Sequence, residues 1–430
     1  MIKNATVILF LIASGCMSAG ADAYYVSPSG SDTNSGTSTD APWQTVARVN
    51  AVPLNAGDSV SFEGGQTLSG NLVISSESGA PGMPITITSY GSGNATIWAA
   101  SGDAVEINKS AYVTVTKLTV SGPGWNLGTL TDDSRGVNLD GGSNNCVVSY
   151  VIAQGFHKAG IASDRSGHDN LLLNDSAIKN GYTGIWVQGT NQQILKCSAD
   201  YNYGDLTVTN NWSGSGIFVS SGSYVTIEDC EASQNGSGQP YRGNGPVGIW
   251  CWDSDHVYIG HCISHDNKRG RATADGDGFD FDGGTTDSTL EYCYSYNNVG
   301  VGYLLYNLSY QNIQNSGNTI RFSVSANDAV AMWFGSTGAA LSNDLYLDNV
   351  FILTNGRSLT QYKDGTYGGV TLNENVWIRG RPVLIRNEPL ESNHTSKKHE
   401  KMVEKRDHKR EEMKKKREEK RKKEAPCQRR

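Results

Sequence analysis

Long hydrophobic runs are missing from this 430-residue sequence. The apolar run from Ala5 to Ala13 is too short to cross a bilayer and no other segment is long enough, so no transmembrane helix is expected. The run follows Lys3 and precedes Ala21-Asp22-Ala23, a small-x-small cleavage pattern. This arrangement predicts a signal peptide over residues 1–23 and a secreted protein. Lipoprotein anchoring at Cys16 is the alternative.

Basic residues are scarce everywhere except near the C-terminus. Residues 397–430 hold 17 of the 36 Lys and Arg and 8 of the 43 Asp and Glu, which leaves a net charge of −16 on the rest. Because phosphate binding requires Lys and Arg, nucleic acid is not an expected partner. The basic stretch has almost no apolar residue, which predicts a disordered or helical tail over residues 391–430. An arm that binds anionic polymers is the alternative.

Proline is also rare, with eleven residues against fifty glycines. This balance, with abundant Ser, Thr and Asn, is typical of many short strands separated by turns, so the expected class is all-β. The cysteines form neither a CxxC pair nor a Cys/His pattern, which gives no sign of a zinc site.

An internal repeat decides the architecture, because a period of 20 to 50 residues indicates a solenoid. One repeated segment contains a cysteine and is followed five residues later by an asparagine. The cysteines are Cys197, Cys230, Cys262 and Cys293, and the asparagines are Asn202, Asn235, Asn267 and Asn298; weaker copies end in Asn180, Asn327 and Asn355. We interpret the asparagines as a structural ladder at a left-handed turn, and the cysteines as a buried stack, free thiols or disulfides.

A second repeated segment begins with glycine and continues as an apolar alternation. The glycines are Gly136, Gly160, Gly184, Gly216, Gly248, Gly278 and Gly302, in steps of 24, 24, 32, 32, 30 and 24 residues. A base period of 24 with loop insertions matches one coil of a parallel β-helix, with coils about 4.8 Å apart. With two alternating strands recognised per repeat, the sequence predicts a right-handed parallel β-helix, a single-stranded solenoid, over residues 24–390.

The N-terminal segment from Tyr24 to Phe62 resembles the capping region of secreted β-helix proteins of the pectate-lyase-like superfamily. Its identifying parts are Tyr24-Tyr25-Val26-Ser27-Pro28, Pro42-Trp43-Gln44-Thr45-Val46 and Gly57-Asp58-Ser59-Val60. The stretch from Trp43 to Val52 is expected to form a short amphipathic helix that closes the open core.

Side-chain alternation along the glycine-led strands defines the outward face of one sheet. Its expected residues are Asn138 and Asp140, Ala162 and Asp164, Trp186 and Gln188, Phe218 and Ser220, Trp250 and Trp252, Asp280 and Asp282, Leu304 and Tyr306, and then Ala331 and Trp333. Large aromatics on a water-facing sheet need a cover. We predict that Trp186, Phe218, Trp250, Trp252, Tyr306 and Trp333 bind the sugar rings of a polysaccharide substrate; cover by inserted loops is the alternative.

The densest polar cluster adds carboxylates to this face. Asp280 and Asp282 share one side of a strand, with Cα atoms roughly 6.5 to 7 Å apart, and Asp277 precedes them. Three neighbouring carboxylates repel one another unless one is protonated or a hard cation binds, and oxygen ligands suit Ca²⁺. A calcium site at Asp277, Asp280 and Asp282, an acid–base pair, and aspartates that cap turns all remain open.

Asp277-Gly278-Phe279-Asp280 is similar to the calcium-binding strand of family-nine pectate lyases. The resemblance implies Ca²⁺ and a lysine that removes a proton beside a uronate carboxylate. The motif's further aspartate is Gly276 here, and Leu304 stands where the family presents its lysine. The substitute base, or a group binding the substrate carboxylate, is expected at Lys268, Arg269 or Arg271, with His157 and Lys158 as further candidates.

The expected function is therefore that of a calcium-dependent lyase on a uronate-containing polymer, with Asp280, Asp282, Lys268 and Arg271 as catalytic candidates. A glycoside hydrolase that uses Asp280 and Asp282, with Asp253 nearby, is one alternative. A polysaccharide-binding solenoid without catalysis is another. A monomer is expected.

Overall fold

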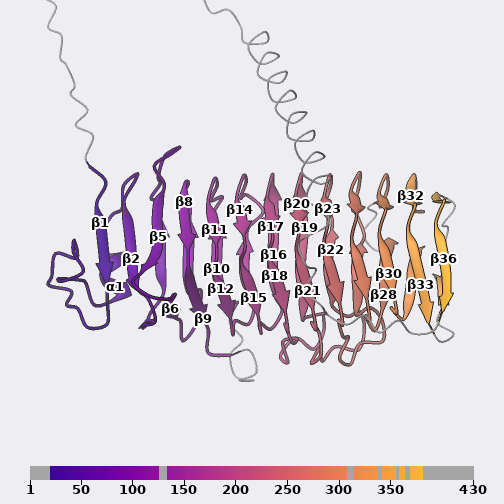
Figure 1. Cartoon of the computed structure of the whole chain (residues 1–430), viewed down its shortest axis with the longest axis horizontal. Helices are drawn as coiled ribbons and strands as arrows, with labels where there is room; N and C mark the ends of the chain where they lie inside the picture. The colour runs from indigo at the N-terminus through magenta and orange to yellow at the C-terminus, as the bar shows by residue number, and fades with distance from the viewer. Residues whose placement is uncertain are drawn as a thin grey trace, which may run out of the picture. The chain divides into compact units, whose positions relative to one another are not determined.

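Three strands make up each turn of the chain in the computed structural model, which describes residues 20–124, 133–307, 314–337, 340–354, 358–363 and 369–380. Every pairing of neighbouring strands in its three sheets is parallel, as a β-helix requires (Figure 1). Residues 1–19, including Cys16, the tail at 391–430 and Asn355 lie outside the described residues.

Sheet A contains 13 strands. They are β1 (Ala23–Val26), β2 (Ser59–Glu63), β5 (Ile85–Tyr90), β8 (Val113–Thr116), β11 (Val147–Ser149), β14 (Leu171–Leu173), β17 (Gln193–Leu195), β20 (Thr226–Glu228), β23 (Tyr258–Gly260), β26 (Thr289–Glu291), β29 (Thr319–Arg321), β32 (Asp344–Leu347) and β35 (Val370–Asn373).

Sheet B contains 12 strands. They are β3 (Thr67–Ser69), β6 (Ala95–Trp98), β9 (Leu118–Ser121), β12 (Ile152–Gln154), β15 (Ser176–Ile178), β18 (Ser198–Asp200), β21 (Glu231–Ser233), β24 (Ile263–His265), β27 (Tyr294–Tyr296), β30 (Val324–Ala326), β33 (Val350–Thr354) and β36 (Val376–Gly380).

Sheet C contains 11 strands and includes the glycine-led segments. They are β4 (Leu72–Ser75), β7 (Val105–Asn108), β10 (Arg135–Asp140), β13 (Ala159–Ser163), β16 (Thr183–Thr190), β19 (Ser215–Ser223), β22 (Val247–Trp252), β25 (Asp277–Phe281), β28 (Val301–Asn307), β31 (Val330–Ser336) and β34 (Ser358–Lys363).

The cysteine-containing repeat spans two strands rather than one. In each copy the residue before the cysteine has a positive φ of 55 to 57°, which turns the chain from sheet A to sheet B. These turn residues are Lys196, Asp229, His261 and Tyr292. Each repeat therefore contains three strands and not the two that were recognised in the sequence. The corner between sheets A and B was not recognised because four unrelated residue types, and no glycine, occupy its left-handed position.

The asparagine ladder is present and buried. Each asparagine donates its backbone N–H and its side-chain amide to the Oδ1 atom of the asparagine in the next coil, at 2.9 to 3.2 Å. The series runs from Asn180 through Asn202, Asn235 and Asn267 to Asn298. Asp328 continues the ladder by accepting from Asn298, so the prediction of Asn327 was wrong by one residue. The left-handed backbone lies one residue before each ladder position, at Tyr201, Gln234, Asp266 and Asn297, and not at the asparagine itself.

The repeated cysteines are free thiols inside the solenoid and not disulfides. Cys197, Cys230, Cys262 and Cys293 are buried and unbridged, and the Cys230 Sγ accepts the backbone N–H of Cys197 at 3.4 Å. Burial raises the pKa of the Cys262 thiol well above its usual range, so these thiols act as small apolar groups.

The predicted capping helix is α1 (Val46–Asn50), shorter than the stretch from Trp43 to Val52. The Thr45 hydroxyl caps its N-terminus by accepting the Arg48 N–H at 3.1 Å. Val46 and Val49 are buried and join Trp43 in the hydrophobic core. The helix therefore covers the first coils of the solenoid, as the apolar spacing predicts.

Sheet C keeps the outward residues in register across successive coils. Trp186, Phe218, Trp250, Asp280, Leu304 and Trp333 are consecutive strand partners. The prediction that Ala331 belongs to this outward row was wrong. Ala331 is the strand neighbour of Gly302 and is buried, because it takes the place of the leading glycine. Trp333 consequently lies beside Leu304, and Gly335 lies beside Tyr306.

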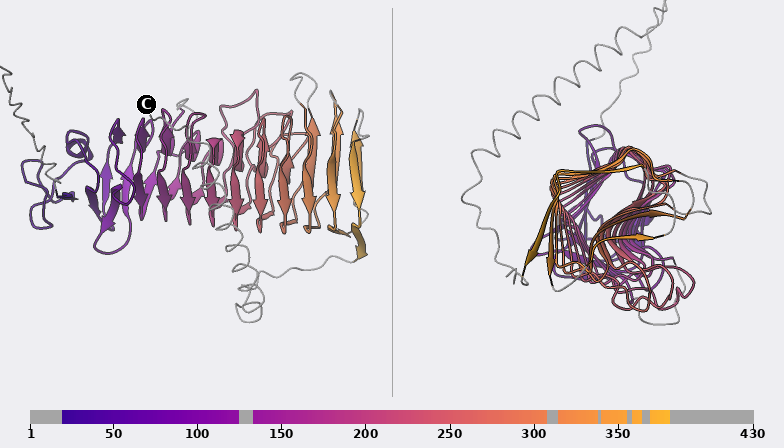
Figure 2. Two further views of the ribbon diagram at one scale, coloured as in Figure 1. Left: turned by 90° about the horizontal axis from the view of Figure 1, so that it is seen from above. Right: turned by 90° about the vertical axis from the view of Figure 1, so that its right-hand side faces the viewer.

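The insertions that lengthen the period lie where sheet B passes to sheet C. Three of them, residues 201–214, 234–246 and 266–276, precede β19, β22 and β25. In the end-on view these pink loops project from one corner of the three-sided coil (Figure 2). No helix in the described part of the chain is long and apolar enough to cross a membrane.

Candidate functional site

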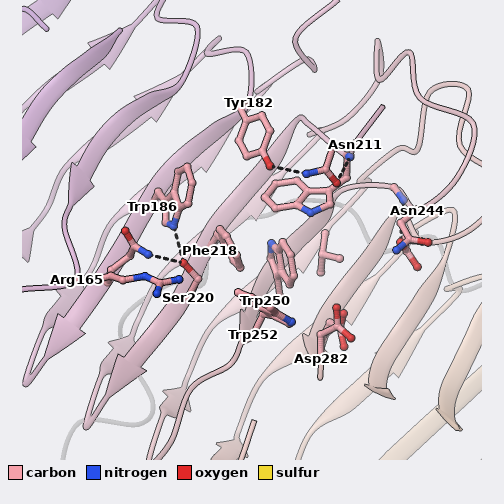
Figure 3. A pocket seen from close by; sticks show the side chains of 16 residues that line it. Arg165, Tyr182, Trp186, Asn211, Phe218, Ser220, Asn244, Trp250, Trp252 and Asp282 are labelled. Atoms are coloured by element: carbon pink, nitrogen blue, oxygen red, sulfur yellow. Dashed lines mark hydrogen bonds between the residues drawn. The ribbon is translucent and has the colours of Figure 1, made fainter. Parts of the chain in front are cut away.

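An aromatic cleft lies on the outer face of sheet C beneath the inserted loops (Figure 3). Its floor comes from β16, β19 and β22, which carry Trp186, Phe218, Trp250 and Trp252. The alternation of each strand turns these rings outward while Ile217, Val219, Ile249 and Cys251 enter the core. The cleft encloses about 340 Å³.

Trp212, from the loop before β19, packs onto this floor. Its ring centroid lies 4.8 Å from that of Trp250 and 5.1 Å from that of Phe218, and Phe218 stacks on Trp250 at 4.0 Å. Only 4% of Phe218 and 5% of Trp250 is exposed, whereas Trp186 and Trp252 are half-buried. The loop residue Trp212 therefore covers the central rings of Phe218 and Trp250. The rings of Trp186 and Trp252, which form the rim of the cleft, stay partly accessible.

A second hollow of about 120 Å³ continues the cleft toward β28 and β31, where Leu304, Tyr306 and Trp333 line it. Both hollows share Asn244, Asp275, Asp280 and Asp282. The aspartates therefore lie between two parts of one groove, with aromatic side chains on either side.

Asp280 is 4% exposed and faces the groove from the centre of β25. Burial raises its pKa well above the ordinary range, and the charges of Asp282, Asp277 and Asp275 raise it further. Its Oδ1 atom is buried without a hydrogen-bond partner, as is the Nε1 atom of its strand partner Trp250. An unsatisfied acceptor beside an unsatisfied donor in a groove is the arrangement that a bound hydroxyl group satisfies.

Asp282 is half-buried at the end of the same strand. Burial raises its pKa to about 7, although the carboxylate accepts the Gly283 N–H at 2.7 Å, and the charge of Asp275 contributes in the same direction. Asp275 comes from the loop before β25 and accepts the Gly245 N–H at 2.8 Å. The carboxyl groups of Asp280 and Asp282 thus occupy different environments and favour different protonation states.

Asp277 lies apart from the groove. It lines a separate hollow with Arg269, Asp275 and Val301, and its Oδ1 atom accepts the Val301 N–H at 2.5 Å. Burial, followed by repulsion from Asp275, raises its pKa well above the usual range, and its Oδ2 atom has no partner. Among the residues with described positions, no three His, Cys, Asp or Glu side chains form a metal-binding group.

The expected basic residues lie outside the groove. Lys268 and Arg271 line neither of its two hollows, although both belong to the loop before β25, and Arg271 is exposed. Arg269 reaches the hollow around Asp277 instead. Among the described residues that line the cleft, Arg165 is the basic one, and Trp186 belongs to the same lining (Figure 3).

The remaining candidates have other surroundings. Asp253 accepts a hydrogen bond from the Ser221 hydroxyl at 2.9 Å and is absent from the groove lining. His157 and Lys158 line a small hollow before β13, together with Tyr182. Tyr182 also lines the aromatic cleft, so these two hollows share a wall.

Sequence reasoning missed the loop residues of the site, namely Tyr182, Asn211, Trp212, Asn244 and Asp275. Loop segments carry no strand alternation, so the pattern that located β22 and β25 says nothing about them. Trp212 alone offered a signal, because a tryptophan within a polar insertion needs an apolar surface to cover.

Replacing Asp282 with asparagine is expected to stabilise the protein at pH 8 and to have little effect near pH 4. A carboxyl group whose folded pKa is raised holds its proton more tightly in the native state, so stability falls as the pH rises from the unfolded value near 4 through about 7. Asparagine removes this loss and retains an acceptor for Gly283. Thermal melts of both proteins from pH 4 to 8 measure it; a difference in melting temperature that is the same at every pH contradicts the assignment.

The family comparison agrees with this architecture. The model described as "Right handed beta helix region" matches residues 135–270 and 205–346, which cover the groove-bearing coils. The chain is a right-handed parallel β-helix protein. The predicted fold class is confirmed. No curated protein sequence matches this one significantly.

Solved structures share the β-helix over most of its length. A GH136 lacto-N-biosidase from Eubacterium ramulus is 17% identical, with a TM-score of 0.56 over 84% of this chain and 68% of that one. A rhamnogalacturonan lyase is 16% identical, with a TM-score of 0.53 over 83% and 87%. A mannuronic acid specific polysaccharide family 6 lyase from human gut microbiota is 12% identical, with a TM-score of 0.55 over 84% and 83%. At these identities the likeness establishes the fold alone.

Proposed function

We propose that this β-helix protein is a secreted glycoside hydrolase that cleaves a neutral polysaccharide or oligosaccharide in the groove of sheet C. The observation that carries the proposal is the pair of buried, unsatisfied polar atoms, Asp280 Oδ1 and Trp250 Nε1, on neighbouring strands of an aromatic-lined groove. The solved relatives whose names state an activity on sugars place both hydrolases and lyases on this fold. The choice between them rests on the residues of the groove.

A neutral substrate follows from the charges at the centre of the groove. Asp275, Asp280 and Asp282 meet there, and the described residues that line the hollow on the β28 side include no Lys or Arg. A uronate carboxylate at this point would add a further negative group beside the carboxylates of Asp275 and Asp282, without a counter-ion. Hydroxyl groups, by contrast, donate to carboxylates, and the C–H faces of neutral sugars cover the rims of Trp186 and Trp252.

Asp280 in β25 and Asp282 directly after it supply the chemistry of glycoside hydrolysis. Asp280, protonated because of its burial, donates its proton to the oxygen of the bond that breaks. Asp282, with a pKa of about 7, is the carboxylate that activates water or attacks the anomeric carbon. This assignment reverses the order of the two enzyme candidates suggested by the sequence, because Lys268 and Arg271 do not line the groove.

A calcium-dependent lyase is the second candidate, and the unpartnered oxygens of Asp277 and Asp280 favour it. Calcium takes six to eight oxygen ligands, so Asp277, Asp280 and Asp282 would need to converge on it. Asp277 instead lines a separate hollow and neither part of the groove, and the described residues form no metal-binding group, so the arrangement does not fit a shared ion. We therefore assign no step of the reaction to a metal.

A panel of neutral and uronate-containing polysaccharides, tested with and without a chelator, distinguishes the candidates. The expected result is new reducing ends from a neutral glycan, no absorbance from unsaturated uronates, and no effect of the chelator. Unsaturated products that disappear with the chelator would establish the lyase and overturn the hydrolase. Retention on a polysaccharide without either product would identify a binding solenoid and overturn both enzymes.

A further inference from the structure

A side pocket of about 100 Å³ opens where β10, β13 and β16 begin, next to the aromatic cleft. Asp133, His157, Lys158, Tyr182, Asp205 and Thr207 line it. Tyr182 belongs to both linings, and its ring lies 4.5 Å from that of Trp212 and 5.8 Å from that of Trp186. A group attached to a sugar at the Trp186 rim is therefore adjacent to this pocket.

His157 gives the pocket an unsatisfied polar atom. Its side chain is 1% exposed, its Nδ1 atom lies 3.4 Å from Asp205 Oδ2, and its Nε2 atom is buried without a partner. Although burial opposes ionisation, hydrogen bonds from His157 and Thr207 lower the pKa of Asp205. When Nδ1 donates to the Asp205 carboxylate, Nε2 is left as an unpartnered acceptor in the wall of the pocket.

Lys158 supplies the complementary donor. Its Nζ atom lies 4.5 Å from the centre of the Tyr182 ring and 5.1 Å from that of Trp186, and 3.5 Å from the exposed carboxylate of Asp133. The two aromatic faces hold the ammonium group between the pocket and the cleft. A ligand that enters the pocket thus meets the acceptors His157 Nε2 and Asp205, and the donor Lys158.

We propose that this pocket binds a neutral, hydroxyl-bearing branch of the glycan whose main chain occupies the aromatic cleft. An anionic branch is disfavoured because Asp133 and Asp205 outnumber Lys158. A hydroxyl group satisfies the site, since it donates to His157 Nε2 and accepts from Lys158. The substrate class rests on the proposed function, whereas the pocket and its unsatisfied nitrogen do not.

Matched pairs of neutral polymers test the proposal: galactomannan with linear mannan, xyloglucan with cello-oligosaccharides, and arabinoxylan with linear xylan. For each pair, kcat/KM is measured from reducing ends with the wild type, His157→Gln and Lys158→Gln. His168→Gln is the control, because His168 also pairs with an aspartate, Asp169, at 2.9 Å, but is exposed outside the pocket. Melting temperatures confirm that each variant is folded.

The wild type is expected to prefer the branched member of one pair at least tenfold. Both pocket variants should reduce this ratio at least tenfold, and the control should retain it. A ratio near one in the wild type, or an unchanged ratio in the folded Lys158→Gln variant, overturns the proposal. If no polymer is cleaved, the hydrolase proposal fails, and the pocket is tested by the retention of the same polymer pairs in affinity electrophoresis. A preference of the wild type for the branched polymer that the pocket variants lose supports the pocket. Equal retention of the branched and the linear polymer rejects it.

Discussion

Replacing Asp280 with asparagine is expected to lower kcat by about 10³-fold while the protein still binds its polysaccharide. The amide has nearly the size of the carboxyl group, so the groove and its contacts with Trp250 remain. It carries no acidic proton, however, and therefore cannot protonate the oxygen of the glycosidic bond. Initial rates and affinity electrophoresis on the polymer identified by the panel measure the two effects separately.

The same variant is expected to melt at a higher temperature than the wild type at pH 7. Asp280 is buried near Asp275, Asp277 and Asp282, and these surroundings disfavour its charge in the folded state. Asp253→Asn is the matched control, since Asp253 pairs with Ser221 away from the groove, and it should keep at least half of the wild-type rate. If Asp280→Asn keeps more than a tenth of that rate, Asp280 is not the proton donor.

Removing the Trp250 side chain is expected to lower the free energy of unfolding by about 3–5 kcal/mol. Trp250 is 5% exposed and packs with Phe218 and Val247 in a small hydrophobic cluster outside the solenoid core. Alanine leaves a cavity beside Phe218 and Trp212, which contact each other and both pack against the Trp250 ring. Denaturant unfolding of Trp250→Ala compared with the wild type measures the loss.

Trp252→Ala is the control, because Trp252 lies two residues further along β22 and is half-buried at the rim. Its cost is expected to be about 1 kcal/mol, with the main effect on polysaccharide affinity. Equal losses of stability in the two variants would show that the loop residue Trp212 does not consolidate a cluster around Trp250.

The coil repeat was predictable because it depends on a few recurring contacts. The glycine near the start of each sheet C strand from β10 to β28 is required where it passes the ladder: a Cβ atom on Gly248 would lie 1.9 Å from Ser264 Oγ and 2.6 Å from Asn267 Nδ2. Such a constraint leaves the same residue at the same place in seven successive coils, from Gly136 to Gly302. The corner before each cysteine leaves no such trace, because Lys196, Asp229, His261 and Tyr292 all adopt it with their side chains directed away from the core.

The floor of the groove was predictable for the same reason, and its cover was not. Alternation places Trp250 and Asp280 on one face whatever the loops do, and the register confirms that they are neighbours. The position of Trp212 depends on how residues 201–214 fold over that face, and no periodic pattern encodes this. Lys268 and Arg271 show the reverse error: closeness to Asp277 in the sequence does not bring a loop side chain into the groove.

The direction of the asparagine ladder bears on how the solenoid is built and lengthened. Each asparagine is one rung of the ladder, and its backbone N–H and side-chain amide find their shared acceptor in the rung that follows it in the chain. Asn202 donates in this way to Asn235, and Asn235 to Asn267. A chain that emerges from its N-terminus therefore carries one open rung at its growing end, however many coils have formed. Since the junctions from Asn180 to Asn298 all have the same chemistry, whole coils are the units in which such a protein gains or loses length.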